Sequence, residues 1–187
     1  PAEIWPLTAT ALARRPAVFA PFVTRPNEKV PDREKLGLAP AEAACSGVYR
    51  LRAARGRADA ALVLQGSEVT MAFVGGVLSR LEQEGVDLDI YYVASAELFD
   101  ALPPAERERI FPEARALEAM AITGFTLATT YRWVRSDRGR AASLYAYSKG
   151  HYLGSGSGPA VLHEAGLDAD GQYAAIRRFL DGKARTK

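Results

Sequence analysis

Apolar and polar residues change their spacing along residues 60–93, and the changes mark a strand, a helix and a second strand. Residues 60–64 form an unbroken apolar run, typical of a strand covered on both faces. Residues 68–84 place apolar side chains three and four positions apart, the pattern of an amphipathic helix (Val69, Ala72, Phe73, Val77, Leu81). Residues 88–93 return to strand character, and such a unit has a strongly preferred right-handed crossover.

The same alternation continues on both sides of this unit. It predicts strands at 47–52, 115–122 and 143–147 and helices at 96–102, 105–111, 125–134, 159–165 and 170–180. The whole pattern predicts an α/β fold, a three-layer open sheet of about five mostly parallel strands with helices on both faces. Gly75 and Gly76 weaken the predicted helix 68–84, and we expect close packing against the sheet to compensate. Gly85 is predicted to end that helix.

Residues 1–44 have a different character. Residues 6–14 predict a short helix and residues 18–23 a strand, although Pro21 would remove one hydrogen bond from its pairing. Residues 24–44 carry three prolines among charges and predict a linker. One helix and one strand do not close a core of their own. The α/β domain is expected to occupy 45–187, within a longer protein, since the sequence begins at Pro1 without a methionine.

Composition narrows the function classes. The chain has 187 residues, 48% of them apolar, and its 24 Lys and Arg are interleaved with 22 Asp and Glu to give a net charge of +2. This balance predicts no nucleic-acid partner, and the longest apolar runs are too short to predict a membrane span. The single cysteine, Cys45, with His151 and His163, excludes an internal disulfide framework and a zinc site, and favours a cytoplasmic location.

Gly66-Ser67-Glu68 is the first candidate site. It follows the apolar strand and opens the helix, where free amide groups and the helix dipole favour anions. The second and third glycines of a dinucleotide motif and the lysine of a phosphate-binding loop are missing. Glu68 itself complements the positive helix end, with Ser67 as the predicted cap. Two interpretations therefore stay open, a capped helix start and a weak anion site.

The second candidate is the glycine-serine loop at residues 149–158. The amide groups of Gly154 and the hydroxyls of Ser155 and Ser157 could hold a phosphate, with help from His151. The alternative is a flexible loop at a domain contact. His163 and Cys45 are expected to be structural, and Glu97, Asp100, Glu106 and Glu108 to form a solvated charged face with Arg107 and Arg109. Since neither a nucleophile–base pair nor a metal-ligand set stands out, we predict no catalytic, cofactor-binding or metal-binding residue in this chain.

Three segments occur in an order that resembles a known family: ADAALVLQGSEV at 58–69, EGVDLDI at 84–90 and SAELFD at 95–100. They resemble the C-terminal domain of transketolases over about residues 46–181. Residues 11–19, ALARRPAVF, look like the last helix and strand of the preceding, pyrimidine-binding domain of that family. The resemblance therefore implies that residues 1–44 are the end of that preceding domain plus a linker. The loop at 149–158 and the segment at 125–145 differ from the family pattern.

The resemblance implies a parent enzyme that moves a two-carbon ketol unit between sugar phosphates on thiamine diphosphate, with Mg²⁺ holding the diphosphate. In that family the cofactor is bound by the two earlier domains at a homodimer interface. The chain itself is therefore expected to bind no cofactor and to serve assembly with those domains. Two alternatives are the matching domain of a 2-oxo-acid dehydrogenase or of a deoxyxylulose phosphate synthase-like enzyme, and a small anion-binding regulatory domain.

Overall fold

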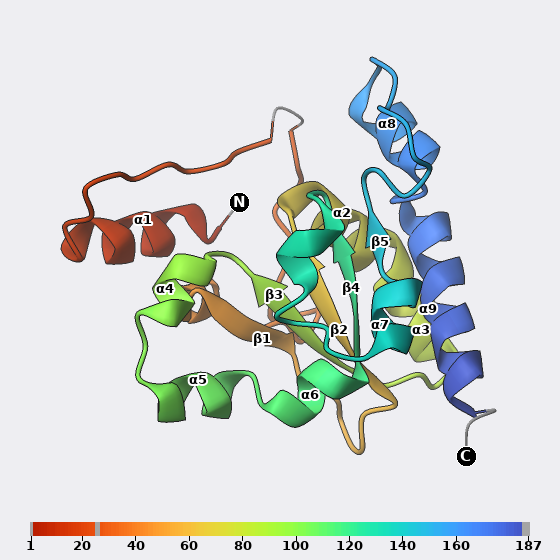
Figure 1. The fold of residues 1–187 in the computed structure, drawn as a ribbon, viewed down its shortest axis with the longest axis horizontal. Coiled ribbons are helices and arrows are strands. Elements are labelled where there is room, and N and C mark those ends of the chain that lie inside the picture. The colour runs from red at the N-terminus through yellow and green to blue at the C-terminus, as the bar shows by residue number, and fades with distance from the viewer. Residues whose placement is uncertain (1, 25–26, 185–187) are drawn as a thin grey trace.

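The computed structural model describes residues 2–24 and 27–184, which build one five-stranded sheet between layers of helices (Figure 1). The strands are β1 (Val48–Arg52), β2 (Ala60–Gln65), β3 (Leu88–Val93), β4 (Ala119–Thr123) and β5 (Leu144–Tyr145). Their order is β1-β3-β2-β4-β5; β1 pairs antiparallel with β3, and the other pairs are parallel. The predicted fold class is confirmed.

The central strand β2 is apolar because both of its faces are covered. Ala60, Leu62 and Leu64 point into one core, whereas Ala61 and Val63 point into a second core on the opposite face. All five side chains are at most 1% exposed. The unbroken apolar run seen in the sequence thus follows from two buried faces and not from a single amphipathic one.

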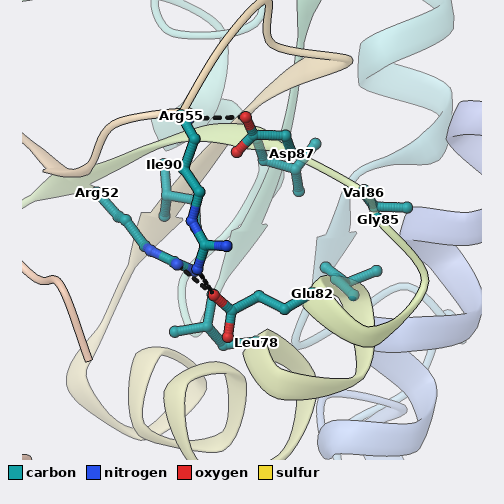
Figure 2. Close-up of a pocket in the computed structure, with 10 residues that line it drawn as sticks. Arg52, Arg55, Leu78, Glu82, Gly85, Val86, Asp87 and Ile90 are labelled. Carbon is teal, nitrogen blue, oxygen red and sulfur yellow. Dashed lines mark hydrogen bonds and ion pairs between the residues drawn. The ribbon is translucent and has the colours of Figure 1, made fainter. Parts of the chain in front are cut away.

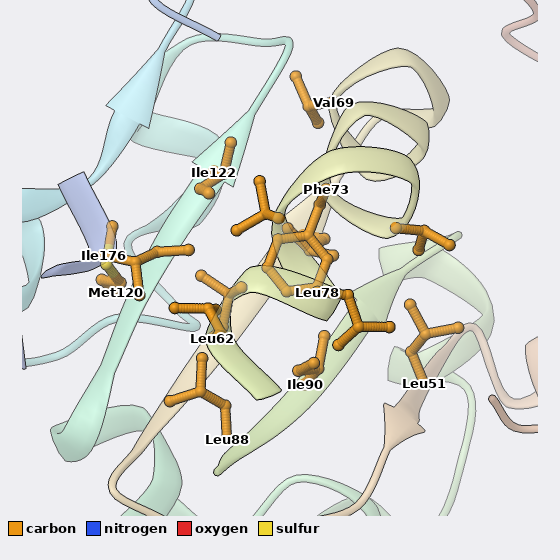
Figure 3. Close-up of a cluster of buried hydrophobic side chains, with 14 of the residues drawn as sticks. Leu51, Leu62, Val69, Phe73, Leu78, Leu88, Ile90, Met120, Ile122 and Ile176 are labelled. Carbon is orange, nitrogen blue, oxygen red and sulfur yellow. The ribbon is translucent and has the colours of Figure 1, made fainter. Parts of the chain in front are cut away.

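Helices supply both covering layers. One face is covered by α2 (Ser67–Ala72), the π-helical turn Phe73–Val77, α3 (Leu78–Gln83) and α9 (Ala169–Ala184). Figure 3 shows side chains from both helical segments and from the strands in this core, among them Phe73, Ile90 and Ile176. The other face is covered by α4 (Ala96–Asp100), α5 (Pro104–Ile110) and α6 (Glu113–Glu118). The remaining helices are α7 (Asp137–Ala142) and α8 (Gly158–Ala165).

The helix predicted over 68–84 forms, but with a π-helical turn where the glycines lie. A Cβ on Gly76 would lie 2.6 Å from the Cβ of Ala169, whereas a Cβ on Gly75 would meet nothing within 4 Å. The predicted packing of the glycines against the sheet was therefore wrong, because Gly76 admits the start of α9 instead. Gly85 ends the helical stretch with a φ of 71°, as predicted.

Two of the elements predicted between residues 115 and 134 were wrong. Residues 115–122 are not one strand: α6 runs through Glu118 and β4 starts at Ala119, because Glu-Ala-Arg-Ala-Leu-Glu are all strong helix formers. Residues 125–134 contain only the short 3-10 helix Leu127–Thr130 in place of a longer helix. There the hydroxyls of Thr129 and Thr130 donate to the carbonyls of Thr126 and Leu127, each at 2.7 Å, and satisfy the backbone locally.

The N-terminal part extends along the domain. Helix α1 (Ile4–Ala13) packs on the 3-10 helix Ala41–Ser46 beside the β1 end of the sheet (Figure 1). The strand predicted at 18–23 was wrong: these residues are exposed and have no strand pairing in the described part of the chain. Among the described helices, none combines the length and the apolar content that crossing a bilayer requires.

Candidate functional site

Gly66-Ser67-Glu68 lies at the carboxyl end of β2, as predicted, but the helix is capped differently. Gly66 is the N-cap with a φ of 110°, in the region that favours glycine, and its carbonyl accepts the backbone N–H of Thr70 at 3.2 Å. Ser67 is the first helical residue and makes no cap hydrogen bond. Its hydroxyl lies 3.2 Å from the hydroxyl of Thr24. The predicted cap role of Ser67 was therefore wrong.

The carboxylate of Glu68 turns toward the adjacent glycines. A Cβ added to Gly124, the first residue after β4, would lie only 2.1 Å from Glu68 Oε1, and one added to Gly66 would lie 3.3 Å from the same atom. The chain's own carboxylate therefore stands between the ends of β2 and β4, where an incoming anion would meet a like charge. This arrangement favours a capped helix start, and anion binding here stays a prediction.

Sequence reasoning missed a polar cluster at the same sheet edge. The side-chain oxygen of Gln65 accepts the hydroxyl of Thr123 at 3.1 Å and lies 2.8 Å from the hydroxyl of Thr129, whose single proton it shares with the carbonyl of Thr126. Thr123 in turn accepts the backbone N–H of Phe125 at 3.0 Å. Amide and hydroxyl groups can orient a polar ligand, but they supply neither a general base nor a metal ligand set. A polar residue ending an apolar strand was the available signal.

The glycine-serine loop is engaged by a glutamate that the sequence did not single out. Both carboxylate oxygens of Glu164, on α8, accept the backbone N–H of Gly154, at 3.1 and 3.2 Å. Oε1 of the same carboxylate lies 3.8 Å from His151 Nε2. The ammonium of Lys149 donates to the carbonyl of Glu164. The groups proposed to hold an anion thus already face a carboxylate, and ligand binding by this loop stays a prediction.

The two serines of the loop are exposed. Ser157 sits at the N-cap position of α8 without a side-chain cap, and Ser155 lies in the open part of the loop. In the described residues, no hydrogen bond or ion pair joins this loop to Gly66, Ser67 or Glu68. The structure therefore presents two separate candidates and not one combined site.

Removing the carboxylate of Glu164 tests its hold on the loop. In Glu164→Ala we expect the amide hydrogen of Gly154 to exchange roughly three- to tenfold faster, because the side chain is partly exposed and its interactions are weak. Hydrogen exchange followed by mass spectrometry measures this. Glu164→Gln is the matched control, since it keeps an acceptor for Gly154 and should change exchange less. Equal exchange in all three proteins would show that the carboxylate does not restrain the loop.

The other titratable groups named from the sequence are structural or surface groups. His163 Nδ1 lies 2.6 Å from Asp168 Oδ2, and the imidazole is 82% exposed. Cys45 donates to the carbonyl of Pro6 at 3.6 Å. Asp100 pairs with Arg132, and this hydrogen bond is the main cause that lowers the pKa of its carboxyl. In residues 2–24 and 27–184, no three His, Cys, Asp or Glu residues cluster as a metal site would require.

A pocket of about 180 Å³ opens at the opposite, amino-terminal edge of β3 (Figure 2). The guanidinium groups of Arg52 and Arg55 both bind Oε1 of Glu82. Asp87 accepts the backbone N–H groups of Arg55 at 2.7 Å and of Gly56 at 3.0 Å. The apolar part of the pocket lining is formed by Leu78, Leu81, Val86, Leu88 and Ile90. Because both arginines are already paired with the carboxylate of Glu82, we interpret the pocket as a surface hollow lined by salt bridges.

Comparison with known proteins identifies the domain to which these features belong. A family model described as the transketolase-like TK C-terminal domain matches residues 47–168. The chain belongs to this family. The match begins one residue before β1 and includes both candidate sites, so the transketolase-like C-terminal domain is the sheet with its covering helices up to the start of α9.

Individual relatives agree with this assignment. The transketolase of Aquifex aeolicus is 32% identical over 143 residues, which are 74% of this chain and 19% of that protein. Solved transketolases from Leishmania mexicana (TM-score 0.57, 16% identity, 76% of this chain and 19% of that one) and Campylobacter jejuni (TM-score 0.53, 20% identity, 71% and 18%) share the fold. The chain thus spans about a fifth of the length of the relatives it matches.

Proposed function

We propose that this chain is the C-terminal section of a transketolase-like enzyme, whose parent protein transfers ketol units between sugar phosphates. The observation that carries the proposal is the family match over residues 47–168 in a chain that spans 19% of a curated transketolase. The section itself is proposed to be non-catalytic and to serve assembly of the parent, including its homodimer. The carboxylates of Glu68 and Glu164 support this, because they stand where an anionic substrate group would bind.

Thiamine diphosphate and Mg²⁺ are assigned by this proposal to the remainder of the parent. The diphosphate needs anion-binding groups, and Mg²⁺ needs carboxylate and carbonyl oxygens in octahedral arrangement. The described residues offer a poor fit, since they contain no metal-ligand cluster and both glycine-containing turns face their own glutamates. When bound elsewhere in the parent, thiamine diphosphate supplies the electron sink for carbon–carbon cleavage.

The N-terminal surface supports contact with further parts of the parent. Exposed apolar side chains gather on α1 and the extended segment after it (Ile4, Trp5, Leu12, Val18, Phe22, Val23). Large apolar side chains exposed close together in the sequence are typical of interaction sites. We therefore propose residues 1–44 as the end of a preceding domain with its linker and residues 45–187 as the C-terminal domain. The single cysteine supports the further proposal of a cytoplasmic parent.

Calorimetry on the 187-residue chain tests the non-catalytic role. Titration with thiamine diphosphate in the presence of Mg²⁺ is expected to give no binding heat, whereas the full-length parent should bind both and turn over a ketose phosphate donor. Micromolar or tighter binding by the chain alone would contradict the proposal. Turnover of pyruvate in place of the ketose phosphate by the parent would point instead to a 2-oxo-acid reaction.

A further inference from the structure

A small buried ion cluster joins the N-terminal helix to the α/β domain. Glu3, at the N-cap of α1, binds Arg33 from the linker through one carboxylate oxygen, Oε1. The hydroxyl of Tyr49, on β1, donates to the same oxygen at 2.9 Å. The side chains of Glu3 and Arg33 are only 13% and 15% exposed, and Tyr49 is buried. Three segments far apart in the sequence therefore share one desolvated charge.

The electrostatics show that this contact is made by a charged carboxylate. Burial by itself raises the pKa of Glu3, but a backbone N–H at Glu3, the Arg33 guanidinium and the Tyr49 hydroxyl together lower it. Burial and the charge of Glu3 raise the pKa of Tyr49, which keeps its hydroxyl protonated as a donor. Arg33 also donates to the carbonyl of Ala39 at 2.6 Å. Losing one member would leave buried polar groups unpaired, which is the costly way to break such a cluster.

Weaker contacts hold the rest of the N-terminal segment along the domain. The Sγ of Cys45 donates to the carbonyl of Pro6, at the start of α1. Farther along, the rings of Phe22 and Phe125 meet edge-to-face with centroids 6.4 Å apart. Between these contacts the chain turns at Arg15, with a φ of 50°, and runs exposed over residues 14–24. The segment is thus fastened at α1 and accessible in the middle.

We propose that Glu3, Arg33 and Tyr49 form an anchor that docks α1 on the C-terminal domain in one fixed orientation. Residues 1–46 lie outside the family match at 47–168, so the anchor connects a segment outside the matched residues to their first strand. The exposed apolar face of α1 (Ile4, Trp5, Leu12) is then presented in a set direction. This inference rests on the proposed function: with α1 fixed in this way, the preceding part of the parent would be oriented relative to the C-terminal domain.

Cutting the exposed segment tests the anchor without any need for cofactor or activity. A specific protease site is inserted between Arg15 and Pro16, the chain is cleaved, and native mass spectrometry follows whether the N-terminal fragment stays bound. We expect retention in the otherwise unchanged chain. Glu3→Gln and Arg33→Gln should weaken retention by about tenfold or more, because a charge-assisted pair in a desolvated site is lost. Tyr49→Phe removes one hydrogen bond and leaves the ion pair, so its retention of the fragment should lie between that of the unchanged chain and that of the two charge variants.

The matched control is Arg109→Gln, which breaks the exposed ion pair of Glu106 and Arg109 at 3.7 Å and should leave retention unchanged. Circular dichroism verifies that each cleaved protein is folded. If Arg33→Gln or Tyr49→Phe disturbs folding, Glu3→Gln still tests the anchor, because Glu3 precedes all five strands in the sequence. Release of the fragment from the unchanged chain, or equal retention in all variants, would overturn the anchor. Neither result depends on ketol transfer by the parent, so the proposed function would stand or fall separately.

Discussion

Replacing Gly47 with alanine is expected to lower the free energy of unfolding by about 3 kcal/mol or more, through two independent effects. Gly47 has a φ of 79°, which L side chains rarely adopt. A Cβ at this position would lie 2.3 Å from the carbonyl oxygen of Ser95 and 2.5 Å from the backbone nitrogen of Phe99. Both atoms belong to the backbone of α4 or its N-cap, so the clash is relieved only by separating α4 from the start of β1. Urea denaturation followed by circular dichroism measures the loss.

Two other glycines separate the effects. Gly85 also has a positive φ, 71°, but a Cβ there meets no atom within 4 Å, so Gly85→Ala should cost only the backbone strain, about 1 kcal/mol. Gly75 has neither constraint and lies in a helical turn. Gly75→Ala should leave the protein unchanged or more stable by up to about 1 kcal/mol. A cost for Gly47→Ala no larger than for Gly85→Ala would show that β1 and α4 are not packed this closely.

The sheet could be predicted from the sequence because its signal is local. Residues 60–64 are apolar without a break, and residues 88–93 are apolar or aromatic except for Asp89; burial on two faces is the physical state that demands such a run. The helix predicted to begin at residue 96 also begins there, and Ser95 Oγ caps it by accepting the backbone N–H of Leu98 at 3.2 Å. Elements whose cause lies within six or seven residues were therefore recovered.

Elements decided by distant contacts were not recovered. The helix propensity of residues 113–118 is local, but the residue at which α6 gives way to β4 is set where Ala119 enters the sheet beside Ala61. The π-helical turn at Phe73–Val77 accompanies the approach of Ala169 to Gly76, across more than ninety residues of sequence. No periodicity in either segment carries such information, because the deciding partner lies elsewhere in the chain.

In the candidate sites, too, the features with a local cause could be predicted and those set by distant residues could not. Position at the end of β2 was predictable for Gly66-Ser67-Glu68, but the direction of the Glu68 carboxylate depends on Gly124 at the end of another strand. The hold of Glu164 on Gly154 likewise joins a helix to a loop. The segment SAELFD, which carries much of the family resemblance, proves to be structural: Ser95 caps α4, Phe99 is buried, and Asp100 pairs with Arg132. Family membership could thus be predicted from residues that build the fold.

Truncating Trp133 to alanine is expected to lower the free energy of unfolding by about 3–5 kcal/mol, the range for a buried aromatic side chain. Trp133 is 2% exposed and lies in the core on the α4–α6 side of the sheet. Its ring meets Phe99 and Phe111 edge-to-face, with centroids 5.4 and 5.6 Å away. Loss of the ring would leave both phenylalanines facing a cavity. Urea denaturation followed by far-ultraviolet circular dichroism measures this without relying on the fluorescence of the deleted tryptophan.

Trp133→Phe is the decisive companion, because the indole N–H of Trp133 is buried without a hydrogen-bond partner among the described residues. Phenylalanine removes that unsatisfied donor, a gain of about 1–3 kcal/mol that offsets the loss of part of the ring. The net cost should therefore stay below about 2 kcal/mol, well under the alanine value. A Phe variant as unstable as the Ala variant would show that the indole N–H is bonded in solution, and then Trp133 holds this core by a polar contact as well as by its volume.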